Sequence, residues 1–166
     1  TGPLRIGDKK MSKSLNNFIS VKNILKNFHP EVLRLFFLST HYRNPITYSK
    51  EVLENTKKIL DRFYSIFSEI KIPTYFTEDE LMKKSFISAL EDDFNSPKAI
   101  QIVQAYARDF EKEEKTDLDK LGTLKSLLNS LGLLKEESDN YFKYGESNLS
   151  KGEIENLISE RNLSLI

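Results

Sequence analysis

A long stripe of apolar side chains between residues 49 and 70 constrains the fold more than any other feature. The inward-facing residues recur at steps of three and four: Val52, Leu53, Thr56, Ile59, Leu60, Phe63, Ile66, Phe67 and Ile70. This spacing puts them on one face of an α-helix of about five turns. Ser49 stands at the N-cap position, so we expect the helix to begin there and to bury its stripe against other helices.

Start signals ahead of apolar runs predict five further helices. They are 20–28 capped by Ser20, 31–41 after Pro30, 77–93 with a Thr77–Glu80 capping box, 95–112 with Asn95 and Pro97, and 117–131 from Asp117 to Gly132. Residues 1–8 are predicted to form no element, and residues 42–48 a loop. Since no alternating pattern favours a strand, we predict an all-α fold, an antiparallel helical bundle.

Charge is distributed unevenly along the chain. The 25 Lys and Arg balance 25 Asp and Glu overall, but residues 1–43 hold eight basic side chains and two acidic ones. A neutral total is therefore compatible with a basic head that meets a polyanion, although a random surface fluctuation would give the same asymmetry.

Several classes of function are excluded. Without cysteine the chain has no disulfide, no thiolate nucleophile and no thiolate-bound zinc. Neither GxxxxGK[ST] nor GxGxxG occurs. His29 and His41 have no carboxylate at ligand spacing, so we predict no metal site. No apolar run approaches the ~20 residues that span a bilayer, and we expect a cytoplasmic protein without membrane contact.

The remaining candidate for chemistry is the basic segment from Lys9 to Asn17. Its lysine ammonium groups and serine hydroxyls suit a phosphate clamp, since lysine is a compact charge on a flexible stem. A solvated basic linker is the alternative that composition alone favours.

The sequence Lys10-Met11-Ser12-Lys13-Ser14 is identical to the KMSKS signature of class I aminoacyl-tRNA synthetases. Four further blocks follow it in order and resemble the cysteinyl-tRNA synthetase family. They are 14–18 with 29–38, then 41–49, then 89–97 with the letters ALEDDFNSP, and finally 154–162. The resemblance covers most of the chain.

This resemblance implies a class I synthetase bundle of the DALR, or anticodon-binding, type and roles for single residues. Lys13 would contact the phosphates of the substrate ATP and stabilise the transition state of cysteinyl-adenylate formation. Lys10, Met11, Ser12 and Ser14 would shape that ATP loop. Residues 31–34 match the DALR element with Glu and Val in place of Asp and Ala, and Asn16 stands where the family usually has Gly.

The same resemblance implies how the chain is organised. The expected parts are 1–19, the KMSKS loop segment; 20–48, stem-contact helices; 49–132, the DALR bundle; 133–149, a linker; and 150–166, the start of a C-terminal domain. The chain would be a piece of a longer ligase that charges tRNA(Cys), partnered by an N-terminal catalytic domain and inactive alone. Zinc would be bound in the full-length enzyme by ligands outside this chain.

Alternative interpretations of the function and of single residues stay open. The alternatives to a ligase are a non-catalytic tRNA-binding or interaction bundle and a related cysteine-activating ligase. Arg34, His41, Tyr42 and Arg43 are candidate tRNA contacts, with structural anchoring and helix-end packing as the competing interpretations. Asp92, Asp93 and Asn95 are predicted to be helix-end and capping residues.

Overall fold

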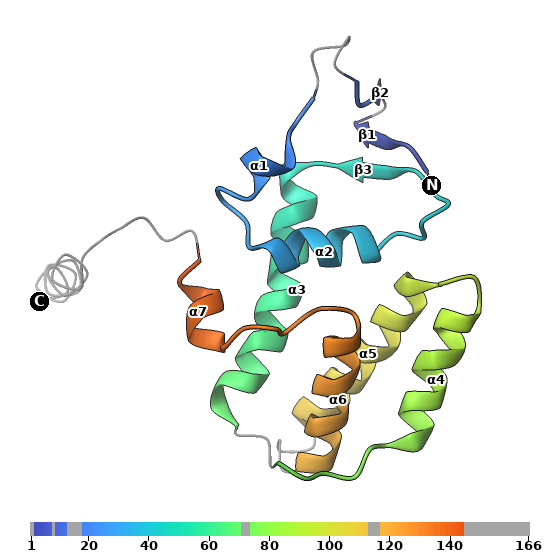
Figure 1. The fold of residues 1–166 in the computed structure, drawn as a ribbon, viewed down its shortest axis with the longest axis vertical. Helices are drawn as coiled ribbons and strands as arrows, with labels where there is room; N and C mark the ends of the chain where they lie inside the picture. Colours follow the sequence, from blue (N-terminus) through green and yellow to red (C-terminus); the bar gives the residue numbers. More distant parts are fainter. Residues whose placement is uncertain (1, 8, 13–17, 71–73, 113–116, 145–166) are drawn as a thin grey trace, which may run out of the picture.

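The computed structural model describes residues 2–7, 9–12, 18–70, 74–112 and 117–144, and α-helix dominates them (Figure 1). The helices are α1 (Val21–Ile24), α2 (Pro30–Leu38), α3 (Lys50–Glu69), α4 (Glu80–Glu91), α5 (Ser96–Lys112), α6 (Leu118–Ser130) and α7 (Ser138–Phe142). The predicted helical bundle is confirmed. No helix of this described part is long and apolar enough to cross a membrane.

Four predicted N-caps are present. The side-chain oxygens of Ser20, Ser49, Asn95 and Asp117 each accept a hydrogen bond from the backbone N–H three residues on, at 2.9–3.2 Å. These bonds satisfy donors that a helix start leaves without an intrahelical partner. The predicted Thr77 cap is wrong, because Asp79 caps α4 and accepts from the N–H of Met82 at 3.0 Å.

Two helices end earlier than their apolar pattern predicts. Helix α1 stops at Ile24 rather than near Phe28, and α2 stops at Leu38 rather than near His41. In α2 the Ser39 hydroxyl donates to the Leu35 carbonyl at 2.7 Å. Side chains of this kind compete with helical backbone bonds at a terminus.

A small three-stranded sheet stands beside the helices, in the order β2-β1-β3. Its strands are β1 (Leu4–Ile6), β2 (Lys9–Lys10) and β3 (Ile46–Tyr48). Strand β1 pairs antiparallel with β2 and parallel with β3. The expectations of no element in 1–8 and a loop in 42–48 are therefore wrong locally, because strands of two or three residues are too short to show a period.

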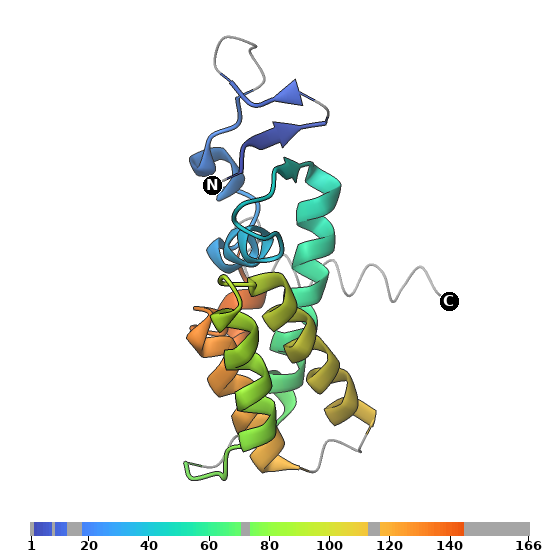
Figure 2. The ribbon, with the colours of Figure 1, turned by 90° about the vertical axis from the view of Figure 1, so that its right-hand side faces the viewer.

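Helix α3 connects the two ends of the molecule. It starts directly after β3 at the sheet and runs down to the level of α4, α5 and α6 (Figures 1 and 2). Its buried stripe includes Leu53, Leu60, Phe63, Tyr64 and Ile66. One continuous core extends from α1 and α2 through α3 to α7.

The chain after α6 also packs on this core. Residues 133–149 stay predicted as a linker, and in its described part Leu133, Leu134 and Tyr141 are buried. The Tyr141 ring stacks on the Tyr64 ring with centroids 3.8 Å apart. Composition did not indicate this, because a few apolar residues anchor an otherwise polar segment. The expected start of a C-terminal domain at 150–166 lies outside the described residues.

Candidate functional site

The basic KMSKS segment begins at the edge of the small sheet. Lys10 ends strand β2 with an exposed side chain, and the Met11 N–H donates to the Leu4 carbonyl at 2.9 Å. Met11 and Ser12 are half-buried. Lys13 and Ser14, the other predicted members of the ATP loop, lie outside the described residues. The start of this loop is thus fixed by strand pairing.

Asp93, which we predicted to lie at a helix end, is contacted by all three residues of the His41-Tyr42-Arg43 cluster. The Tyr42 hydroxyl donates to Asp93 Oδ1 at 2.7 Å. The Arg43 guanidinium contacts both oxygens, with Nη2 3.0 Å from Oδ1 and Nε 2.7 Å from Oδ2. His41 Nε2 lies 3.0 Å from the Asp93 carbonyl oxygen, while its Nδ1 accepts weakly from the Arg43 N–H at 3.4 Å. Three consecutive residues therefore converge on one aspartate some fifty positions away.

The electrostatics of this cluster follow from its geometry. The hydrogen bonds from Arg43 and then from Tyr42 hold the pKa of Asp93 below its usual value. The bond to Asp93 raises the pKa of Tyr42, because the phenol donates to a negative charge. The Arg43 guanidinium also lies 5.2 Å from the centre of the Tyr42 ring. At neutral pH the cluster is a charged, hydrogen-bonded unit on the surface.

Arg34 lies on α2 with an exposed side chain that rests near the end of α6. A Cβ atom added to Gly132 would stand 2.9 Å from Arg34 Nη1, so the two residues are in close contact. Both line a hollow of about 680 Å³ together with Leu25, Phe37 and Lys135. The lining combines apolar side chains with the cations Arg34 and Lys135 and the acids Glu31 and Glu136.

A second hollow of about 550 Å³ adjoins the end of α2. Its lining includes Phe37, Tyr42, Leu90 and Phe94. Phe94 is 74% exposed. The two hollows share Phe37 and Leu38, so α2 presents aromatic and basic side chains over one stretch of surface.

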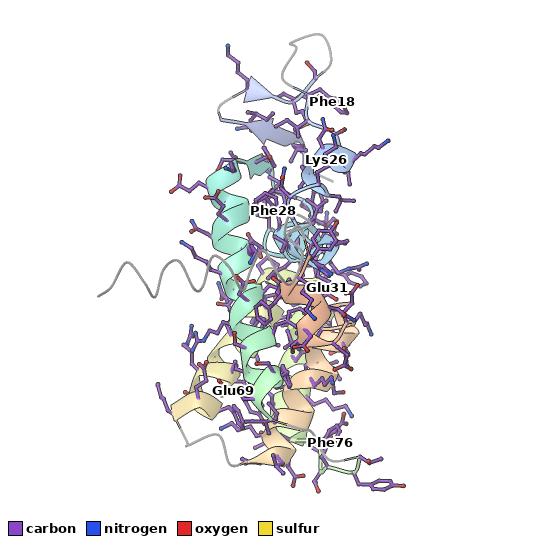
Figure 3. The ribbon with its side chains drawn as sticks, turned by 90° about the vertical axis from the view of Figure 1, so that its left-hand side faces the viewer. Phe18, Lys26, Phe28, Glu31, Glu69 and Phe76 are labelled. Carbon is purple, nitrogen blue, oxygen red and sulfur yellow. The ribbon has the colours of Figure 1, made fainter. Side chains whose placement is uncertain are left out.

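The burial of Glu31 is not predicted from the sequence, where this residue appears only in the match to the DALR element. It is 6% exposed and accepts from the Tyr64 hydroxyl at 3.0 Å. It also accepts from the backbone N–H groups of Leu134 and Lys135 at 2.8 and 2.9 Å. Figure 3 labels this side chain where α2 meets the chain between α6 and α7. An acid within an apolar helix was the signal that could have revealed it.

No group of three or more His, Cys, Asp or Glu side chains suited to a metal ion occurs within the described ranges. The tRNA-contact candidates Arg34, His41, Tyr42 and Arg43 stay predictions. The structure brings the last three together and places Arg34 apart from them, over the first hollow.

Comparison with known proteins gives two family models and a set of relatives. Residues 1–58 match the model described as "tRNA synthetases class I (C) catalytic domain", and residues 85–135 match "DALR domain". The boundaries that we predicted for the parts of the chain stay predictions beside these matches.

The relatives include proteins named cysteine–tRNA ligase from three different bacteria. Those of Hydrogenovibrio crunogenus, Methylococcus capsulatus and Legionella pneumophila are 38%, 41% and 38% identical over 162, 170 and 161 residues. Each alignment covers 96% of this chain but only 35%, 37% and 35% of the relative. The chain thus spans about a third of the length of the relatives that it matches.

Proposed function

Because this chain belongs to the cysteine–tRNA ligase family, we propose that it supplies the KMSKS ATP loop and a tRNA-binding helical domain to such an enzyme. The whole reaction is ATP-driven activation of cysteine and its transfer to tRNA(Cys) in the cytoplasm. The observation that carries the proposal is an alignment with cysteine–tRNA ligases over 96% of the chain.

Within this proposal, Lys10 to Ser14 close over the ATP phosphates. Lys13 follows the charge that develops as the α-phosphate is attacked by the cysteine carboxylate and pyrophosphate leaves, since a positioned cation stabilises such a transition state. The pairing of β2 with β1 supports the role, because it gives the loop a fixed base at Lys10.

The helical part is proposed to face tRNA through α2 and the segment that follows it. Arg34, His41, Tyr42 and Arg43 combine cations with aromatic rings, which suits contact with phosphates and unpaired bases. Zinc, which the family resemblance implies, is assigned to residues outside this chain, and no step here passes through it. The remaining catalytic domain of the enzyme is the expected intramolecular partner.

The direct test is Lys13→Ala in a complete ligase that carries this sequence, with Lys9→Ala as the matched control one strand position before Lys10. We expect Lys13→Ala to slow cysteine-dependent ATP–pyrophosphate exchange by about 10²–10³. Lys9→Ala should leave the rate near that of the parent. An equal rate for the two variants would contradict the role of Lys13.

Charging of tRNA(Cys) tests the rest of the proposal. A complete ligase that exchanges pyrophosphate with cysteine but charges no tRNA would identify a small-molecule ligase instead. Binding of tRNA without any pyrophosphate exchange would identify a non-catalytic binding bundle. Both outcomes contradict the proposed function.

A further inference from the structure

We propose that Asp93 is a positioning residue, which fixes the strands that carry the KMSKS segment relative to the helical bundle. Asp93 lies in the turn between α4 and α5, whereas Lys10 ends β2 in the sheet. The inference rests on the proposed function for its catalytic meaning, but the placement of the sheet can be measured without any catalysis.

The first step is the turn that presents Asp93. Asp93 and Phe94 both have φ of +52°, a backbone conformation that residues other than glycine rarely adopt. The turn is fixed by its own backbone bonds, with Phe94 N–H donating to Leu90 at 2.9 Å and Asn95 N–H to Ala89 at 3.2 Å. An unfavourable conformation that is held in this way aims the Asp93 carboxylate at residues 41–43.

The second step is the set of hydrogen bonds that holds the chain after α2. Tyr42 and Arg43 donate three bonds to the Asp93 carboxylate, and bidentate pairing with arginine fixes direction as well as distance. The Ser96 hydroxyl adds a bond to the Leu38 carbonyl at 2.8 Å. The start of α5 therefore holds both the end of α2 and the residues that follow it.

The third step leads from that segment to the sheet. The Tyr42 carbonyl accepts from the Gly2 N–H at 2.8 Å, and the Ile46 N–H donates to the Pro3 carbonyl at 3.0 Å. The approach is close, because a Cβ on Gly2 would lie 1.9 Å from the Asn44 carbonyl oxygen. Strand β1 then pairs with β2, which ends at Lys10. Asp93 is thus connected to the base of the ATP loop through Tyr42.

Hydrogen exchange on this chain tests the connection, with Asp93→Asn as the variant. Asp92→Asn is the matched control, because Asp92 lies in the same turn, is 66% exposed and comes only within 4.0 Å of Lys98. The measured quantities are the exchange rates of the amides in β1 and β3, relative to those in the middle of α4 and α5. If Asp93 acted only on its own turn, the variant would change amide exchange in the helices and leave amide exchange in the strands unchanged.

We expect Asp93→Asn to speed exchange in both strands by about threefold or more, as for loss of a surface ion pair that has added hydrogen bonds. Asp92→Asn should leave the strands unchanged. Equal strand exchange in the two variants would overturn the proposal. Tyr42→Phe, which removes one of the three bonds to the Asp93 carboxylate, is the second variant if Asp93→Asn does not fold, and a smaller rise in the same strands is expected.

In a complete ligase, Asp93→Asn should then lower kcat for pyrophosphate exchange while leaving the KM for cysteine unchanged. If the unchanged complete ligase showed no cysteine-dependent pyrophosphate exchange, the proposed function would be contradicted. The hydrogen-exchange result on the strands would still stand. A looser sheet with unchanged kcat would overturn the catalytic meaning of the connection and leave the structural connection between Asp93 and the sheet standing.

Discussion

The Tyr64 hydroxyl donates to Glu31 Oε2 across 3.0 Å, and both residues are buried where α3 crosses α2. Glu31 uses its other acceptor positions on the backbone of Leu134 and Lys135, which come a hundred residues later. One carboxylate therefore joins α2, α3 and the chain after α6. Buried charges are tolerated when all of their acceptors are used in this way.

We predict that Glu31→Gln lowers the free energy of unfolding by about 2 kcal/mol, since the amide nitrogen would face donors where the carboxylate now accepts. Urea denaturation of this chain measures the change. Glu137→Gln is the matched control, because Glu137 is exposed and makes no side-chain cap bond. Equal stability of the two variants would contradict the role of Glu31.

The second prediction concerns alkaline pH. Burial first, and then the bonds to Glu31 and Asp61, raise the pKa values of Tyr64 and Tyr141 well above the ordinary value of about 10. The folded state thus keeps these protons longer than the unfolded state, so the contribution to stability is complete below pH ~10 and is lost as pH rises above it.

Thermal unfolding of the parent from pH 8 to pH 11 should therefore show a falling Tm above pH ~10. Tyr141→Phe should weaken this dependence, because it removes one of the phenols whose pKa is raised in the folded state. Tyr75→Phe is the control, since Tyr75 is 90% exposed. The explanation fails if Tyr141→Phe and Tyr75→Phe give the same dependence on pH.

The third prediction compares two candidates for the cap of α4. Asp79 accepts from Met82 and from the Tyr106 hydroxyl, each at 3.0 Å, whereas Thr77 is exposed. Asp79→Ala should cost about 1 kcal/mol, and Thr77→Ala less than about 0.5 kcal/mol. Chemical denaturation checks both, and a larger loss with Thr77→Ala would contradict the observed cap.

The bonds from Met82 and Tyr106 also lower the pKa of Asp79. Its contribution to stability is therefore present above the unfolded pKa of about 3.9 and is lost as pH falls below it. The difference between the parent and Asp79→Ala should shrink in acid. A difference that stays constant down to pH 2 would exclude this explanation.

Most of the helices could be predicted because their signals are local. Ser49 and Asp117 cap the helices that begin next to them, and the stripe from Leu53 to Ile66 repeats within one helix. The sheet could not be predicted, since Leu4 pairs with Ile46 forty-two positions later and neither strand is long enough to show a pattern. Pairing at such separation depends on the packed helices between the strands.

The candidate site divides in the same way. The five residues of the KMSKS segment follow one another in the chain, and so do His41, Tyr42 and Arg43. Each group is therefore visible in the sequence. The link from Tyr42 and Arg43 to Asp93 crosses about fifty residues and depends on a turn with positive φ, which the sequence did not predict. Sequence reasoning placed Asp93 at a helix end and so missed its charge partner.

The fourth prediction concerns Gly132 at the end of α6. Its φ is +73°, and its N–H donates to the Asn129 carbonyl at 3.0 Å, which is a common way to end a helix. Gly132→Ala should cost about 1–2 kcal/mol from backbone strain. A Cβ there also meets Arg34, so the double variant with Arg34→Ala should recover part of the loss, and a fully additive pair would exclude the contact.

The last prediction tests Arg34 as a contact for tRNA against its role as a structural anchor. If Arg34 meets a phosphate, Arg34→Ala should weaken binding of tRNA(Cys) to this chain and reduce the slope of log K against log salt by about 0.7 to 0.9. Lys58→Ala is the control, because it removes an exposed cation from α3, away from the residues that line the first hollow. Fluorescence anisotropy over a salt series measures both slopes. An anchor at Gly132 would instead lower the Tm of Arg34→Ala and leave its salt slope equal to that of Lys58→Ala, which would reject the contact.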